Sequence, residues 1–331
     1  MRKTALCLAG LGAMLVPALS TTPAMALATK TWVSGTGNDA NPCTVTQPCA
    51  TFQHAYNVTA PGGEVGVLNA GEYGQVGIAK SISIINDGAG EARIYDPQVG
   101  SPAISVNAGA GDVIIVRGLV LDGGMLGETG MFFTTGSALH VQNCVIKNFQ
   151  ASGESGLPGF TGIGLMMENQ ANSQLFVSDT LIYNNGSVAH TGGIRIWSFG
   201  GHAKVVLDRV RLENNVVGLD VDGTGATGGA HVILRNSTVS GNAGHGISAF
   251  TTAGKGPALI VVEGTASVGN AGSGILADGP GATVLLGKST LTRNGAGVTT
   301  SNGGQLISYG DNQNNNNVGP EGTPSSSYSL F

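Results

Sequence analysis

The sequence reads Leu207-Asp-Arg-Val-Arg-Leu-Glu-Asn-Asn215 and then Gly218-Leu219, and the architecture of the whole chain follows from this unit. A short run of alternating apolar and polar residues that ends in asparagine returns along the chain. Its copies end at Asn148, Asn185, Asn215, Asn242, Asn270 and Asn294. After each copy comes a glycine followed by an aliphatic residue, at Gly162, Gly193, Gly218, Gly246, Gly274 and Gly297. These glycines are 31, 25, 28, 28 and 23 residues apart, so the chain is built from repeats.

The alternation within each unit is the period of a β-strand, and no run is long enough for a helix. Such strands bury an apolar face only if successive units stack, at about 4.8 Å per strand. Asparagines at one register, from Asn185 to Asn294, can then form a ladder of amide hydrogen bonds. Leucine-rich repeats and propeller blades need other patterns, and the left-handed β-helix needs a hexapeptide period. The sequence predicts an all-β, right-handed parallel β-helix of about nine to ten coils.

The first 28 residues form a separate segment. Arg2 and Lys3 precede an apolar run over residues 5–19, and small residues up to Ala28 offer cleavage sites. This pattern is typical of a secretory signal peptide. No later stretch is apolar enough to span a bilayer, so we expect a secreted or periplasmic protein.

Charge and cysteine usage exclude several functions. The chain has 15 Lys and Arg residues and 20 Asp and Glu residues. The sequence contains no basic patch that could bind a nucleic acid backbone, so we expect no nucleic acid partner. Cys43 and Cys49 are close in sequence, with a proline nearby on each side, and we expect them to form a disulfide in an oxidising compartment. Cys144 is then a buried thiol. Neither the ligand spacing nor a histidine cluster of a metal site is present, so no metal is expected there.

The N-terminal part of the mature chain carries a family resemblance. Trp32-Val-Ser-Gly-Thr-Gly-Asn-Asp39 and Pro48-Cys-Ala-Thr-Phe-Gln-His-Ala55 resemble the opening of secreted right-handed β-helix proteins of the pectate-lyase-like superfamily, in its uncharacterised bacterial branch. The resemblance implies the fold and leaves the activity open. Thr51 can cap a short helix whose apolar face closes the first coil. We therefore divide the mature chain into a cap with the first coil (29–80), repeats (81–310) and a polar tail (311–331).

The strand that begins at each repeated glycine offers a candidate surface. If its aliphatic residue points inward, the next residue points outward, and so does the one two positions later. The two predicted outward rows are Gly164, Arg195, Asp220, Ser248, Leu276 and Thr299, and Met166, Trp197, Asp222, Phe250, Asp278 and Ser301. His190 and His245 fall at the edge of this face.

We interpret this face as a sugar-binding groove. Aromatic rings stack on sugars while charged groups bind hydroxyls or carboxylates, so Trp197, Phe250 and Asp278 are the predicted substrate contacts. The predicted catalytic residues are Asp220, Asp222, His245 and Arg195. An ordinary ion pair between Arg195 and Asp220 on adjacent coils would explain these two charges equally well.

Known motifs match this face only in part. Gly244-His245-Gly246 is similar to the Gly-His-Gly motif of polygalacturonases, but their second aspartate falls on Val221 here. Asp220 and Asp222 would lie about 7 Å apart along a strand, a separation compatible with inverting hydrolysis. Calcium-dependent lyases use a cluster of acidic ligands and a basic residue. Asp220, Asp222 and Asp278 with Arg195 resemble this arrangement only weakly. No cofactor is therefore expected, and calcium stays open.

Together these observations predict a monomeric, exported β-helix that binds extracellular or envelope polysaccharide or another extracellular macromolecule. Cleavage by a hydrolase or lyase reaction is open at this point. The alternative is a noncatalytic structural or adhesive surface protein that has the same face but processes no sugar.

Overall fold

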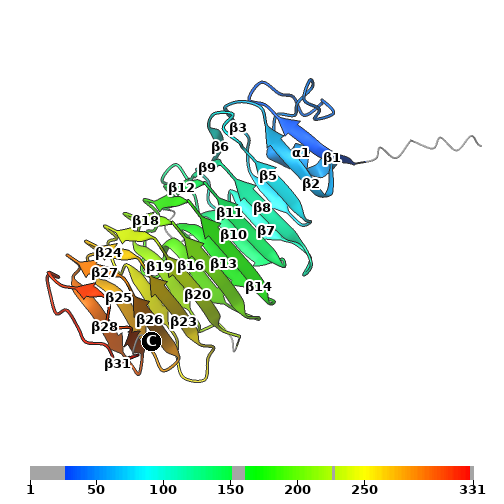
Figure 1. Ribbon diagram of the computed structural model, residues 1–331. Helices are drawn as coiled ribbons and strands as arrows, with labels where there is room; N and C mark the ends of the chain where they lie inside the picture. Colours follow the sequence, from blue (N-terminus) through cyan, green and yellow to red (C-terminus); the bar gives the residue numbers. More distant parts are fainter. Residues whose placement is uncertain (1–26, 151–160, 226–227, 329–331) are drawn as a thin grey trace, which may run out of the picture.

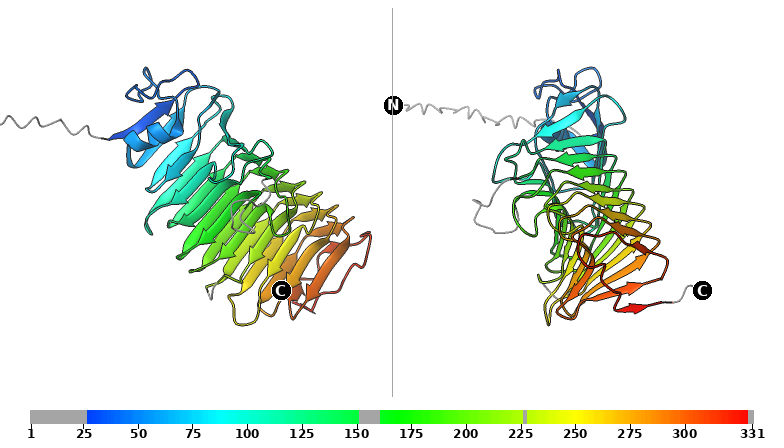
Figure 2. Two further views of the ribbon diagram at one scale, coloured as in Figure 1. Left: turned by 180° about the vertical axis from the view of Figure 1, so that it is seen from behind. Right: turned by 90° about the vertical axis from the view of Figure 1, so that its left-hand side faces the viewer.

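The computed structural model describes residues 27–150, 161–225 and 228–328. In this part of the chain the strands form three parallel sheets, and from β2 onward each strand lies in a different sheet from the strand before it. Figure 1 shows the coils stacked along one axis, and Figure 2 shows the same stack from behind and from the side. The predicted signal segment lies outside these residues, apart from residues 27 and 28.

The twelve-stranded sheet consists of β1 (Ala28–Val33), β2 (Thr59–Val67), β5 (Ile82–Ile85), β8 (Val113–Arg117), β11 (Ala138–Gln142), β14 (Ser173–Ser178), β17 (Ala203–Asp208), β20 (Ala230–Arg235), β23 (Ala258–Glu263), β26 (Ala282–Gly287), β29 (Gln305–Ser308) and β31 (Ser326–Ser327). The ten-stranded sheet consists of β3 (Gly71–Glu72), β6 (Ala92–Tyr95), β9 (Leu119–Asp122), β12 (Val145–Lys147), β15 (Leu181–Tyr183), β18 (Arg211–Glu213), β21 (Thr238–Ser240), β24 (Ala266–Val268), β27 (Thr290–Thr292) and β30 (Gln313–Asn314).

The nine-stranded sheet, which carries the candidate site, consists of β4 (Val76–Ile78), β7 (Ile104–Asn107), β10 (Thr129–Thr135), β13 (Ile163–Asn169), β16 (Gly192–Ser198), β19 (Val217–Asp222), β22 (Ile247–Phe250), β25 (Ser273–Asp278) and β28 (Ala296–Ser301). Nine coils therefore contribute to all three sheets, and β29 and β30 begin a tenth. This confirms the predicted parallel β-helix.

The interior is filled by aliphatic residues stacked in register. One such row runs through the twelve-stranded sheet and consists of Leu139, Leu175, Val205, Val232, Ile260, Val284 and Leu306. Each of these side chains is at most 1% exposed. Stacking thus buries an apolar face that no single coil could cover.

The asparagine ladder is present and explains why asparagine and glycine recur together. The Asn185 amide donates to Asn215 Oδ1 at 3.0 Å, and the Asn242 amide donates to Asn270 Oδ1 at 2.8 Å. The ladder continues through Asn294 to Asn317. A Cβ atom at Gly218 would lie 3.0 Å from the Asn242 amide nitrogen, and Gly193, Gly246 and Gly274 meet the ladder similarly. Glycine therefore leaves the space that the buried amide occupies.

Both ends of the solenoid are covered. Helix α1 (Phe52–Val58) begins after Thr51, whose hydroxyl accepts from the His54 N–H, and it buries Phe52, Ala55 and Tyr56. This confirms the predicted capping helix, which lies at the N-terminal end in Figure 1. At the other end, the segment expected as a polar tail adds β30 and β31 to two of the sheets. Within the described residues, no helix is both long and apolar enough to cross a lipid bilayer.

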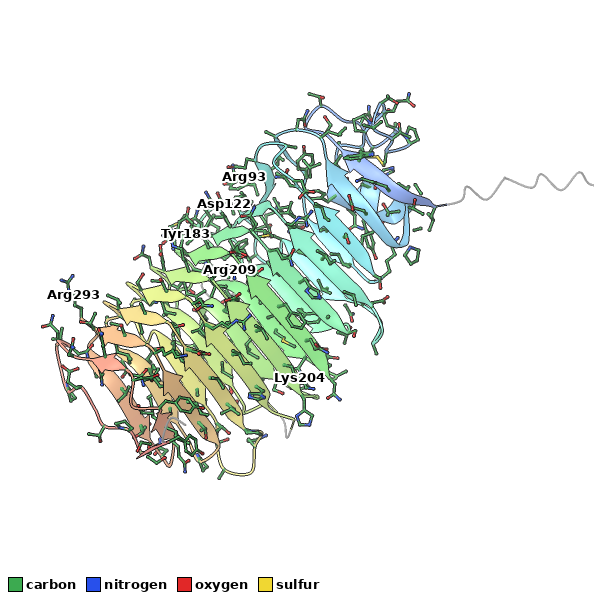
Figure 3. All side chains as sticks on the ribbon, viewed as in Figure 1. Arg93, Asp122, Tyr183, Lys204, Arg209 and Arg293 are labelled. Atoms are coloured by element: carbon green, nitrogen blue, oxygen red, sulfur yellow. A yellow bond between two sulfur atoms is a disulfide. The ribbon has the colours of Figure 1, made fainter. Side chains whose placement is uncertain are left out.

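Charged side chains line the outside of the ten-stranded sheet. Arg93 on β6 bonds Asp122 on β9 of the next coil at 3.1 Å, and Arg209 bonds Asp179 at 2.7 Å between the turns that lead into β18 and β15. Figure 3 shows Arg93, Asp122, Tyr183 and Arg209 along this side of the solenoid. The Arg209–Asp179 pair is exposed and contributes little stability, whereas the Asp122 carboxylate is buried beneath Arg93.

Candidate functional site

The outer face of the nine-stranded sheet carries the predicted site residues in two registered rows. Arg195 pairs with Asp220, which pairs with Ser248, while Trp197 pairs with Asp222, which pairs with Phe250. Asp278 follows Phe250 on the next coil. The predicted rows are thus correct from β16 onward, and they share one face.

The prediction is wrong by two residues at β13. Ile163 pairs with Gly192, so Met166 lies beside Arg195, and Glu168 lies beside Trp197. Gly164, not Gly162, occupies the position of the repeated glycine. A shift of two residues keeps the same side chains facing inward, so the alternation alone cannot detect it. Glu168 was missed for this reason.

Arg195 is the hub of a buried polar cluster. Its Nη2 bonds Asp222 Oδ2 at 2.9 Å, and its Nη1 donates to the carbonyl oxygen of His190 at 2.8 Å. The second Asp222 oxygen, Oδ1, accepts from the backbone N–H and the hydroxyl of Thr224. The expected pairing of Arg195 with Asp220 is secondary, because Nε stands 3.9 Å from Asp220 Oδ2. Asp222 is therefore a partner of Arg195, with both oxygens engaged.

Asp220 is buried without a satisfying donor. It is 2% exposed, and neither carboxylate oxygen has a hydrogen-bond partner among the described residues. The nearest cationic atoms are His190 Nδ1 at 3.5 Å and Arg195 Nε at 3.9 Å. A buried charge without close hydrogen bonds is costly, so the His190 ring and the Arg195 guanidinium are the groups that offset the charge of this carboxylate.

The surroundings of the two histidines beside Asp220 shift their pKa values in opposite directions. The interaction with Asp220 raises the pKa of His190 above its ordinary value, although burial opposes it. Burial lowers the pKa of His245, and its Nδ1 accepts the backbone N–H of Ser273 at 3.0 Å. Neutral His245 therefore carries its proton on Nε2, where it can only donate. One histidine is biased toward the cation and the other toward the neutral form.

A hollow of about 470 Å³ opens over this cluster. Its lining includes His190, Asp220, His245, Ser248, Phe250 and Asp278. The rings of His190 and Phe250 lie 5.7 Å apart. The hollow thus combines a carboxylate pair, two imidazoles and one aromatic ring.

Trp197 lines a second hollow of the same size, which opens on the same sheet toward the N-terminal coils. Phe132 and Met166 line it with Trp197, and Glu128 and Glu168 add carboxyl groups. Burial raises the pKa of Glu168. The predicted single groove is therefore two neighbouring hollows on one face, with Trp197 in one and Asp220 in the other.

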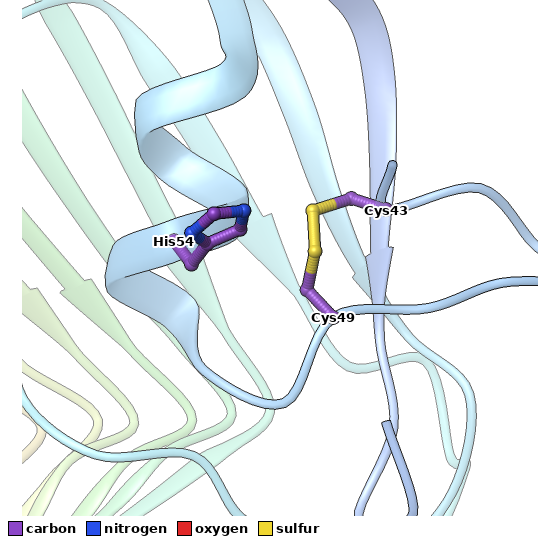
Figure 4. A group of neighbouring side chains, drawn as sticks. All are labelled: Cys43, Cys49 and His54. Atoms are coloured by element: carbon purple, nitrogen blue, oxygen red, sulfur yellow. A yellow bond between two sulfur atoms is a disulfide. The ribbon is translucent and has the colours of Figure 1, made fainter. Parts of the chain in front are cut away.

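The cysteines have structural roles. Cys43 and Cys49 form the expected disulfide, with His54 of α1 beside it, as Figure 4 shows. Because the two sulfurs are bonded to each other, they are not thiolate ligands for a metal. Cys144 is buried, and burial raises its pKa to about 11.

Sequence reasoning placed His190 only at the edge of the face and missed its contact with Asp220. The signal available was its position in the short loop before Gly192, which enters the strand of Arg195. His190 has a positive φ of 62°, and it lines the same hollow as Asp220. Nothing in the alternating pattern predicts this backbone conformation.

Comparisons with known proteins show the fold. No protein-family model matches the sequence, and no curated protein sequence matches it significantly. A solved structure titled Geobacillus virus E2 ORF18 superposes with a TM-score of 0.56 at 13% identity, over 87% of this chain and 60% of that one. This chain therefore spans less than two thirds of the viral protein's length.

Two lyase structures are also similar. Pectate lyase Pel9A superposes with a TM-score of 0.53 at 14% identity, over 91% of this chain and 78% of the lyase. An alginate lyase from Paenibacillus sp. str. FPU-7 has a TM-score of 0.49 at 14% identity, over 91% and 98% of the two chains. At these identities the likeness is one of architecture, and the chain is a right-handed parallel β-helix with the pectate-lyase-like fold.

Proposed function

We propose that the chain binds a polysaccharide along the outer face of the nine-stranded sheet. The observation that carries the proposal is the pair of hollows on this face. They are lined by strands from β10 to β25, which span about 24 Å at about 4.8 Å per coil. A long, open face of this kind fits an extended polymer better than a compact ligand.

The chemistry of the two hollows suits sugars. Phe132 and Trp197 offer aromatic surface, while Asp278 and His245 offer an acceptor and a donor for hydroxyl groups. Sugar rings have apolar faces and polar edges, so they need both kinds of contact. A pectate lyase shares the fold, which supports a polysaccharide as the ligand class.

The charges favour a neutral polymer over a polyanion. Glu128 and Glu168 line one hollow, and Asp220 and Asp278 line the other. The guanidinium of Arg195 is engaged by Asp222, and the whole chain carries a net charge of −5. Like charges placed along a binding face oppose a uronate polymer, so the proposed ligand is an uncharged polysaccharide.

The proposal places the protein outside the cytoplasm. A disulfide between Cys43 and Cys49 is typical of an oxidising compartment, and residues 1–28 have the sequence pattern of a signal peptide. Extracellular or envelope polysaccharide is the polymer available there.

The test is binding of the mature chain to a panel of soluble glucans, mannans, xylans, polygalacturonate and alginate, measured by calorimetry. Loss of a stacking aromatic costs about 2 kcal/mol, so we expect Trp197→Ala to bind about 30-fold more weakly. Tyr183→Ala is the matched control, because Tyr183 lies on the ten-stranded sheet. Unchanged affinity in Trp197→Ala, or binding confined to polyanions, would overturn the proposal. Absence of binding to every polysaccharide in the panel would favour the structural or adhesive alternative.

A further inference from the structure

We propose that His190 and Asp220 form an acid–base dyad that hydrolyses a glycosidic bond of the bound polymer, with His190 as the proton donor. This inference rests on the proposed function and deepens it by naming the reaction and the group that performs it.

The first support is the geometry of the pair. Asp220 faces Nδ1 of His190 and is almost fully buried, whereas the His190 side chain is 50% exposed at the edge of the hollow. A buried carboxylate 3.5 Å from Nδ1 favours a proton on that atom and leaves Nε2, on the opposite edge of the ring, for proton transfer. The pair therefore has an inner member that orients and an outer member that can reach a ligand.

The second support is that several hydrogen bonds fix the backbone at and around His190. Its φ of 62° lies in the left-handed region, which residues other than glycine rarely adopt. Arg195 fixes the His190 carbonyl at 2.8 Å, and Asp222 fixes Arg195. The Thr191 hydroxyl accepts from the backbone N–H of Val188 in the same loop. Arg195 and Asp222 are therefore positioning residues for His190.

The charges around His190 favour its protonated form, which suits a proton donor. Asp220 and Asp222 favour its cation, while Arg195 and His245 oppose it, and the net effect is a raised pKa. The ring is therefore protonated over more of the neutral pH range than an ordinary histidine. Elimination from a uronate would need an unprotonated base, so this protonation state favours hydrolysis.

In the proposed hydrolysis, His190 acts as the acid and Asp278 as the base. His190 Nε2 gives its proton to the glycosidic oxygen while the bond from that oxygen to the anomeric carbon breaks. Water forms a new bond to the anomeric carbon and gives one proton to the carboxylate of Asp278, which lines the same hollow. Proton exchange with solvent restores His190 and Asp278. His245 Nε2–H donates to a sugar hydroxyl and takes no part in the proton transfer.

The experiment measures release of reducing ends from the neutral polymer that binds most tightly. General acid catalysis contributes about 10²- to 10⁴-fold, so we expect His190→Gln to lower kcat at least 100-fold with KM changed little. His231→Gln, on the exposed side of the twelve-stranded sheet, is the matched control and should retain the parent's kcat.

A pH profile separates the dyad from a structural role. The parent's kcat should fall as the pH rises through the raised pKa of His190, and Asp220→Asn should move this limb to lower pH. NMR titration of the His190 ring should show the same displacement without any substrate. Asp222→Asn should lower kcat through the position of His190.

Three results would overturn the dyad. They are an unchanged kcat in His190→Gln, an unchanged pH for the alkaline fall of kcat in Asp220→Asn, and a product with the ultraviolet absorbance of an unsaturated sugar. A parent that binds a neutral polymer and releases no ends also overturns it, while the proposed binding function stands. Absence of binding defeats the proposed function itself.

Discussion

Replacing one rung of the asparagine ladder tests the physical basis of the fold. Asn242 is 1% exposed, and its amide donates to Asn270 Oδ1 at 2.8 Å and to the Leu212 carbonyl at 3.3 Å. Its Oδ1 accepts the backbone N–H of Asn215 at 2.9 Å. Asn242→Ala removes all three bonds and leaves two buried backbone groups, the Leu212 carbonyl and the Asn215 N–H, without these partners.

The expected loss of stability follows from this count. The bond to Asn270 is worth about 1 kcal/mol, and leaving the Leu212 carbonyl and the Asn215 N–H without these partners costs about 1 to 2 kcal/mol each, so the variant should lose about 3 to 5 kcal/mol. Asn172→Ala is the control, because Asn172 is exposed and its Oδ1 accepts only one backbone N–H, from His202. An exposed substitution of this kind changes stability by about 0.5 kcal/mol or less.

Urea denaturation followed by circular dichroism gives the two free-energy differences. Coils in a solenoid contact mainly their neighbours, so hydrogen exchange should show the loss of protection concentrated in the strands around Asn242, from β18 to β24. A cost below about 1 kcal/mol, equal to the control, would show that the ladder is a consequence of stacking and does not stabilise it.

Three further predictions concern the cysteines and a histidine. Replacing Cys43 and Cys49 with serine opens a short loop and should cost about 2 kcal/mol in thermal or urea unfolding, without changing polymer affinity. Cys144, with its pKa raised to about 11 by burial, should react with iodoacetamide only at the rate at which the chain unfolds, as mass spectrometry would show. Burial lowers the pKa of His245 below 6.5, so the unfolded chain binds more protons than the folded one at acidic pH. Stability should therefore fall as the pH drops below about 6.5, and His245→Gln should flatten this part of the profile of melting temperature against pH. His190 has the opposite sign, because its stabilisation is complete below 6.5 and is lost as the pH rises through its raised pKa.

The features that repeat were predictable from the sequence, because stacking forces equivalent residues into contact. The ladder from Asn185 to Asn294 and the rows from Arg195 and Trp197 onward lie where their spacing predicts. The cap helix was also predictable, because Thr51 and its apolar residues are local signals. The shift at β13 was not, since a displacement of two residues preserves the alternation on which the prediction depended.

The contacts of the site depend on geometry that the repeat pattern does not contain. Cross-strand pairing places Arg195 directly beside Asp220, yet its guanidinium reaches past that residue to Asp222. His190 approaches Asp220 from a left-handed backbone conformation, which the repeat pattern does not predict. Long side chains and loops choose among several neighbours within reach, so the sequence predicted the members of the cluster better than their pairing.

That choice of partner determines what Asp220 can do. Had Arg195 formed a direct bidentate pair with Asp220, both carboxylate oxygens would be neutralised and satisfied, and His190 would lose the charge that favours its cation. Because Asp222 engages Nη2 and Thr224 holds the other oxygen of Asp222, the guanidinium stays 3.9 Å from Asp220. Asp222 thus has two effects through one arginine: it keeps Asp220 available to His190, and it anchors the His190 carbonyl through Nη1. The two aspartates therefore differ in role because of a diagonal contact between adjacent coils.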